Sequence, residues 1–142
     1  MRLSTYNADY NQWIQDTIQN LEQRDFETID WDNLIEELDS MGKNNKRALV
    51  SLLTRLIEYL LKLSYWESQK TKSGNHWSAE IVNFRAQIQS CLEDSPSLRS
   101  EMQMFYEKAH PVAIKSVSKL FALPENAEIS LLNALDEDWF PQ

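Results

Sequence analysis

The scarcity of glycine is the feature that most restricts how this chain can fold. The 142 residues include only two glycines, Gly42 and Gly74, and four prolines. Average usage of about 7% glycine and 5% proline would give roughly ten and seven. Dinucleotide-binding turns and Walker A loops need glycines at fixed, short spacing, and tight-turned sandwiches need many turn residues. We therefore expect an all-α protein without a glycine-rich phosphate loop.

One helical pattern dominates the chain between residues 44 and 66. Apolar residues recur there in alternating steps of three and one, which is the spacing of one face of an α-helix. The members of this series are Leu49, Leu52, Leu53, Leu56, Ile57, Leu60 and Leu61. We expect a long central helix, third in chain order, with its charged residues on the opposite face.

Weaker patterns of the same kind predict further helices, about six in all. We expect them at about residues 8–23, 31–41, 75–93, from Pro96 onward, and 127–136. Hydrophobic residues make up 42% of the chain, which is typical of a globular protein with a core of its own. The sequence therefore predicts a helical bundle that forms a single domain over residues 1–142.

Residue types at the helix ends predict where these helices begin and stop. Asp30 is expected to be an N-cap whose carboxylate accepts a backbone N–H from Asp32 or Asn33. Gly42 has the residue type favoured just past a helix, so the second helix is expected to end there. The sequence therefore separates the second helix from the third.

Two other positions predict interruptions later in the chain. The polar segment 68–75 contains Gly74 and is expected to be the longest loop. Pro111 lies inside an apolar helical pattern and predicts a kink or break near His110, because proline lacks the backbone N–H.

Net charge is unevenly distributed along the chain. The total is −8, with −8 on residues 1–42, +5 on residues 43–85 and −5 on residues 86–142. An acidic protein is a poor general binder of nucleic acid, because phosphate neutralisation dominates that affinity. The basic middle segment still leaves a local binding site open as a hypothesis.

The basic middle segment also holds aromatic rings, and together they form the candidate interaction patch. Its members are Trp66, Lys70, Lys72, His76, Trp77 and Arg85. Interleaved rings and cations suit base stacking with phosphate contacts, or the anchoring of an acidic protein partner. The structural alternatives are that Trp77 fills the core, that the lysines are merely solvated, and that the basic helix lies against the acidic N-terminal segment.

Catalytic and metal-binding arrangements are weakly indicated. Asp32 and Glu36 lie four residues apart, so both carboxylates project from one helical face, as Mg²⁺ binding would require. A capped, solvated helix start explains the same residues. Cys91 with either His76 or His110 has the residue types of a nucleophile and base, but a buried inert thiol is the favoured interpretation. We assign no catalytic residue, metal ligand or cofactor.

The last residues of the chain combine acids with two large rings. Trp139 and Phe140 follow three consecutive acidic residues. The rings either pack back into the bundle, which would hold the C-terminus in place, or form a short docking peptide.

The complete chain resembles the family called domain of unknown function 29, which is widespread in cyanobacteria and found in other bacteria. The similar stretches cover about residues 6–141 in order: 9–13, 29–37, 41–42, 60–62, Trp77, 92–98 and 135–141. The resemblance implies a small helical bacterial protein. It implies no reaction, cofactor or agreed partner, so it assigns no site residue.

Three functions follow as hypotheses, in decreasing order of support. The first is a non-enzymatic module for protein interaction or self-association, as a homo-oligomer or with another protein. The second is nucleic-acid binding or processing through residues 43–85, and the third is a divalent-metal-dependent hydrolase built on Asp32 and Glu36. A single cysteine and the lack of a spanning apolar run predict a cytoplasmic protein that does not enter a membrane.

Overall fold

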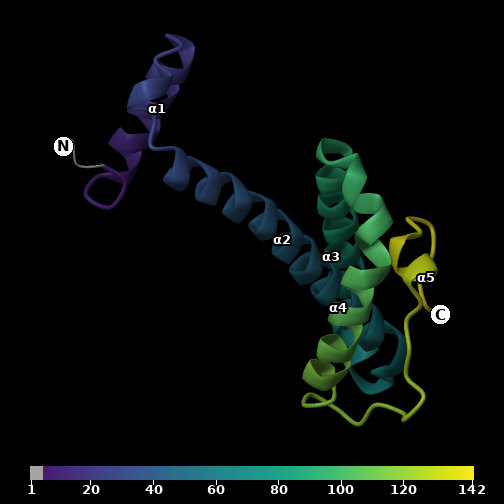
Figure 1. The fold of residues 1–142 in the computed structure, drawn as a ribbon. Coiled ribbons are helices and arrows are strands. Elements are labelled where there is room, and N and C mark those ends of the chain that lie inside the picture. Colours follow the sequence, from purple (N-terminus) through teal and green to yellow (C-terminus); the bar gives the residue numbers. More distant parts are fainter. Residues whose placement is uncertain (1–4) are drawn as a thin grey trace. The chain divides into compact units, whose positions relative to one another are not determined.

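The protein is all-α, as the glycine scarcity predicts (Figure 1). The structure, a computed structural model, describes residues 5–142, and no strand occurs among them. The α-helices are α1 (Tyr10–Glu22), α2 (Trp31–Tyr65), α3 (Glu67–Asp94), α4 (Met102–Val117) and α5 (Leu131–Leu135). Two 3-10 helices, η1 (Phe26–Thr28) and η2 (Pro96–Glu101), precede α2 and α4. The described part thus has five α-helices instead of the expected six.

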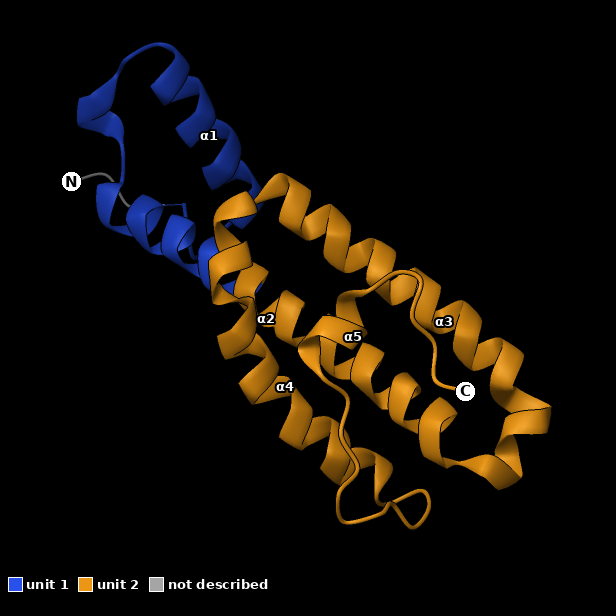
Figure 2. Ribbon diagram, turned by 90° about the vertical axis from the view of Figure 1, so that its right-hand side faces the viewer, with its two compact units in different colours: residues 1–44 blue, residues 45–142 orange. Residues whose placement is uncertain are grey.

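The chain divides into two compact units (Figure 2). Residues 1–44 form unit 1 and residues 45–142 form unit 2, with the division inside α2. Within unit 1, Trp13, Thr17 and Ile29 are buried. A single domain over the complete chain stays a prediction.

Unit 2 is built around one hydrophobic core to which all three long helices contribute. The leucine series of α2 is its centre, because Leu49, Leu53 and Leu56 are completely buried. α3 adds Ile81 and Ile88, and other core residues come from α4 and α5. The apolar spacing read from the sequence therefore identifies the helix face that forms the core.

The predicted stop at Gly42 is wrong, because α2 continues for 35 residues without a break. Neither glycine has a positive φ, so Gly42 does not adopt the left-handed conformation of a helix C-cap. Glycine inside a helix costs only about 1 kcal/mol relative to alanine. Burial of the downstream leucines outweighs that cost, and Lys43 pairs with Asp39 at 2.9 Å across Gly42.

The predicted loop at residues 68–75 is also wrong, because α3 begins at Glu67, directly after Trp66. Buried Trp77 anchors this first part of α3 to the core. The polar residues before it are compatible with a helix that is largely solvated, so polarity alone did not distinguish helix from loop. Gly74 lies where its missing Cβ would be 3.9 Å from Leu63 Cδ1, an ordinary packing distance.

α4 is not broken at Pro111, which lies inside the helix and is exposed. The proline removes one backbone hydrogen bond at a cost of about 3 kcal/mol. Ala109, Ala113 and Val117 are completely buried on both sides of it. Their packing keeps the helix continuous.

The last predicted helix is shorter than expected, since only Leu131–Leu135 is α-helical. Ser130 is its N-cap, and its hydroxyl accepts the backbone N–H of Asn133 at 3.1 Å. Residues 127–130 approach it without helical structure. Downstream, Trp139 and Phe140 are half-buried and pack against the core of unit 2, so the rings fold back as one sequence interpretation expected.

Candidate functional site

The structure places the two tryptophans of the candidate interaction patch against the core. Trp77 is only 5% exposed, and its ring stacks on that of Trp66 with centroids 5.7 Å apart. Trp66 also stacks on Phe121 at 4.8 Å. These rings are engaged with one another, as the core-filling interpretation of Trp77 expected.

Arg85 is also interior, with 5% of its surface exposed. Its Nε donates to the carbonyl of Ala134 at 2.8 Å, and Nη2 donates to that of Asn133 at 3.1 Å. The guanidinium lies 5.1 Å from the centre of the Phe140 ring. Burial lowers the pKa of Arg85, while nearby Asp136 and Glu137 act in the opposite direction. Arg85 therefore joins α3 to the C-terminal segment.

The remaining patch residues lie nearer the surface of α3. Lys72 and His76 are exposed and Lys70 is half-buried. The His76 ring meets the edge of Tyr59, 6.4 Å away between centroids. The ammonium of Lys62 lies 4.6 Å above the same tyrosine ring. Nucleic-acid binding through residues 43–85 stays a prediction. Its proposed stacking residues, Trp66 and Trp77, stack on each other, and Lys72 and His76 are the exposed members of the patch.

Lys62 was not singled out from the sequence, although it is half-buried and contacts Tyr59. Burial of its ammonium lowers the pKa of Lys62. Glu58 acts to raise that pKa and Arg55 to lower it. Its four-residue spacing from Glu58 was visible in the sequence, but its contact with Tyr59 required the structure.

Two acidic residues at the start of α2, Asp30 and Glu37, make hydrogen bonds within unit 1. Asp30 caps α2 by accepting the backbone N–H of Asn33 at 3.4 Å, which confirms the predicted N-cap. Glu37 accepts hydrogen bonds from the hydroxyls of Tyr6 (2.6 Å) and Tyr10. These bonds stabilise the carboxylate, so the pKa of Glu37 is lowered and that of Tyr6 rises to about 12.

A metal centre at Asp32 and Glu36 has no further ligands in the structure. Among residues 5–142, no group of three or more histidine, cysteine, aspartate or glutamate side chains is arranged to hold a metal ion. The hydrolase hypothesis therefore rests only on the two carboxylates of Asp32 and Glu36 on α2.

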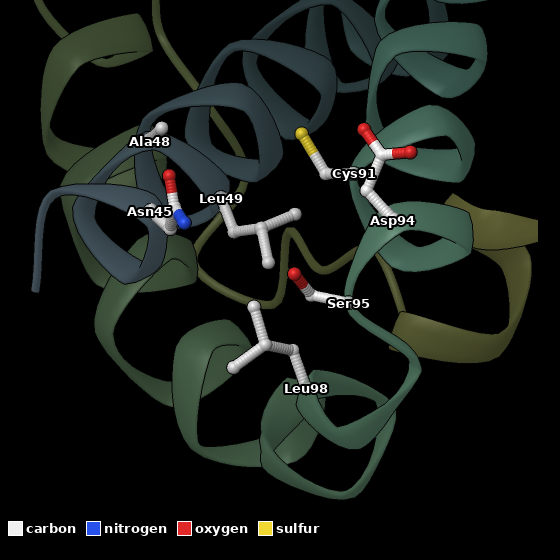
Figure 3. A pocket seen from close by; sticks show the side chains of 7 residues that line it. All are labelled: Asn45, Ala48, Leu49, Cys91, Asp94, Ser95 and Leu98. Carbon is white, nitrogen blue, oxygen red and sulfur yellow. The ribbon is translucent and has the colours of Figure 1, made fainter. Parts of the chain in front are cut away.

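Cys91 lines a small cavity in unit 2, with a volume of about 120 Å³ (Figure 3). Its thiol is half-buried. The other lining residues are Asn45, Ala48, Leu49, Asp94, Ser95 and Leu98. No histidine is among them, so the cavity does not bring together the Cys–His pair that a thiol nucleophile requires.

His110 has a structural partner on another part of unit 2. Its Nε2 accepts the backbone N–H of Ile129 at 3.1 Å. Tyr106, one turn earlier on α4, donates its hydroxyl to the carbonyl of Ile129 at 2.6 Å. The two side chains thus satisfy both backbone groups of Ile129. Burial lowers the pKa of His110, and Glu128 acts to raise it.

One surface feature escaped sequence reasoning, namely an exposed apolar line on the first part of α2. We call it the α2 stripe, and it consists of Trp31, Ile35, Leu38 and Met41. Their exposed fractions are 45%, 62%, 59% and 59%. The helical spacing was visible in the sequence, but such spacing normally marks a core-facing side. Within unit 1, the structure shows all four side chains exposed.

The indole of Trp31 is held in place on this stripe. Its Nε1 donates to the backbone carbonyl of Phe26 at 3.1 Å, and the two rings lie 6.3 Å apart. The stripe is thus an ordered face with its polar group satisfied, so covering it would leave no donor unpaired.

The fold and these features define an all-α protein in which the first part of α2 carries an exposed apolar stripe. The chain belongs to the family described as Domain of unknown function DUF29, whose model matches residues 5–140. Comparisons with curated proteins and with solved structures gave no match. None of the helices in the described part is both long and apolar enough to cross a membrane.

Proposed function

We propose that this protein is a non-enzymatic interaction module that binds through unit 1. The observation that carries the proposal is the distribution of exposed apolar side chains. Twelve large hydrophobic residues are exposed among residues 5–142, and seven of them precede residue 45. Clustered exposed apolar surface is typical of interaction sites, whereas scattered single residues are normal.

The α2 stripe is the central part of this surface. Its four side chains follow one another at intervals of three and four residues, so they share one side of the helix. This is the arrangement by which an amphipathic helix contacts a groove or a second helix. Burial of a leucine or isoleucine contributes about 1.5–3 kcal/mol, so two such residues can dominate an interface.

We also propose that the protein works in the cytoplasm. Its support is the single cysteine, Cys91, which has no partner for a disulfide within the chain. Disulfide-poor small domains are usual in reducing compartments.

The proposal is tested by removing the apolar groups of the stripe. In the double variant Ile35→Ser/Leu38→Ser, we expect loss of about 3 kcal/mol of binding free energy, roughly a hundredfold in Kd. The measurement is affinity capture from the native host with the tagged wild-type chain and the variant, followed by titration of whatever is retained specifically.

A matched control is available in unit 2. Val82 and Leu132 are 57% and 82% exposed, so Val82→Ser/Leu132→Ser removes comparable apolar surface elsewhere. The control should retain the wild-type binding profile. Equal retention by the stripe variant and the wild-type chain would contradict the proposal.

A further inference from the structure

The cavity beside Cys91 combines apolar and polar lining residues (Figure 3). Leu49 of α2 and Leu98 of η2 are its buried members, at 0% and 8% exposed. Asn45 and Asp94 are exposed, so the cavity opens to solvent. Every lining residue belongs to unit 2. A lining of this kind suits a small amphipathic molecule.

The polar side chains of the cavity are not used by the fold. They are Asn45, Cys91, Asp94 and Ser95, and none of them makes a side-chain hydrogen bond or ion pair within the described part of the chain. Ser95 lies between α3 and η2, yet its hydroxyl caps neither helix. A ligand can therefore bind these groups without breaking a hydrogen bond that holds the protein together.

The charge at the cavity is negative. Among the described residues, Asp94 is its one charged lining residue. Asp94 is also the last residue of α3, where the helix dipole adds negative potential. A cation is attracted to such a site, whereas a carboxylate or phosphate is repelled.

The cations near the cavity in sequence do not line it. Lys46 follows Asn45 but is paired with Glu101 at 3.1 Å. Arg47 lies two positions from both Asn45 and Leu49, which places it on the opposite side of α2. Arg99 follows Leu98 and lies about a third of a turn further around η2. The carboxylate of Asp94 is therefore the dominant charge at the opening.

We propose that this cavity binds a small organic cation, a primary ammonium on a short aliphatic chain. The ammonium donates to the Asp94 carboxylate, the Ser95 hydroxyl and the Asn45 carbonyl oxygen, and the chain packs on the two leucines. The volume is about 120 Å³. Because one water needs about 10–15 Å³ by this measure, there is room for about eight waters, or an alkylamine of about six non-hydrogen atoms. The site is separate from the surface proposed for unit 1.

Cys91 provides the assay, because it is the one cysteine in the chain. Alkylation of its thiol by neutral iodoacetamide is followed by mass spectrometry of the intact protein, with pentylammonium as the added cation. At about five times its Kd, pentylammonium should slow alkylation about sixfold by occupying the cavity. Pentanoate, which has a similar chain and the opposite charge, and uncharged 1-pentanol should protect the thiol much less.

Asp94→Asn should weaken protection by pentylammonium about tenfold or more, because it removes the charge that pairs with the ammonium. Glu93→Gln is the matched control. It removes the same charge one residue away, and Glu93 lies two positions from both Cys91 and Ser95, on the opposite side of α3. It should protect like the wild-type chain. Both positions are exposed, and thermal melts verify that the variants fold.

Three outcomes would overturn the proposal. The first is alkylation that pentylammonium does not slow at any concentration. The second is equal protection by pentanoate or 1-pentanol, which would show a cavity that does not select a cation. The third is protection that Asp94→Asn leaves unchanged. Affinity capture with the stripe variant is unaffected by these results, so the proposed function of unit 1 is judged separately.

Discussion

At the scale of single residues, Arg85 shows how a charged group becomes part of the interior. Its two donors bind the carbonyls of Ala134 and Asn133 at the end of α5. Nη1 is buried without a hydrogen-bond partner. Arginine near a helix C-terminus also interacts favourably with the helix dipole. From its residue type, Arg85 was expected to be a surface cation. Its burial and its hydrogen bonds to α5 show that it holds the C-terminal segment against α3.

Replacing Arg85 by methionine should destabilise unit 2 by about 2 kcal/mol. Methionine fills similar space but leaves the buried carbonyl of Ala134 without its donor, and an unsatisfied group costs about 1–3 kcal/mol, whereas the carbonyl of Asn133 keeps the backbone N–H of Asp136. Urea denaturation followed by circular dichroism measures the change. Arg55→Met, at an exposed position of α2, should shift stability by less than about 0.5 kcal/mol. Similar losses in both variants would argue against the role of Arg85.

His110 should make stability depend on pH. Its pKa is lowered in the folded protein, because burial disfavours the imidazolium. Below the unfolded pKa of about 6.5, the unfolded chain binds more protons, so stability falls as pH decreases toward the folded pKa. Protonation of Nε2 would also remove the acceptor for the Ile129 N–H. Stability measured between pH 7.5 and about 5 should therefore decrease.

His110→Gln should flatten this pH dependence, because the amide does not titrate while its oxygen can accept the same hydrogen bond. His76→Gln is the matched control, since His76 is exposed and lies outside this contact. If His110→Gln and the wild-type chain lost stability equally over this pH range, another group would be responsible.

At the scale of elements, the continuity of α2 and α3 can be tested through the two glycines. Gly42→Ala and Gly74→Ala should each stabilise the protein by about 0.5–1 kcal/mol, because alanine favours a helix interior. A Cβ at Gly42 would meet no atom within 4 Å, and one at Gly74 would make ordinary contacts. If α2 instead ended at Gly42 in a left-handed cap, the alanine there would destabilise. Thermal or urea unfolding measures whether Gly42→Ala raises or lowers the free energy of unfolding.

Helices with a buried apolar face could be predicted from the sequence, but the positions where helices end could not. The leucine series from Leu49 to Leu61 and the helix at Tyr10–Glu22 follow directly from apolar periodicity. Gly42 and the polar residues 68–75 resemble ends and loops locally, but packing elsewhere in the same helices overrides those preferences. Apolar periodicity therefore identified the helices, whereas residue type alone placed their ends and the loops between them wrongly.

Candidate sites were harder to predict, for a related reason. Trp77 and Arg85 belong to residue types that often form interfaces, yet both face inward. Ile35 and Leu38 have the spacing of a core-facing side, yet they remain exposed. Composition and spacing identify which residues share a face. Whether that face is covered depends on contacts distant in the chain.

At the scale of the molecule, charge and apolar exposure are concentrated in the same part of the chain. Residues 45–142 contain eleven basic and twelve acidic side chains and are nearly balanced. Most of the net charge of −8 therefore belongs to unit 1, which also holds seven of the twelve exposed large hydrophobic residues in the described part. A net charge of this size repels surfaces of the same sign and attracts those of the opposite sign.

The placement of Trp31 gives the molecule a natural optical reporter. All five tryptophans lie within residues 5–142: Trp31 is exposed, Trp66 and Trp139 are half-buried, and Trp13 and Trp77 are buried. Indole emission moves to shorter wavelength when water leaves its surroundings. Covering the surface around Trp31 should therefore shift part of the emission of the unlabelled chain to shorter wavelength, and Trp31→Phe should remove that shift.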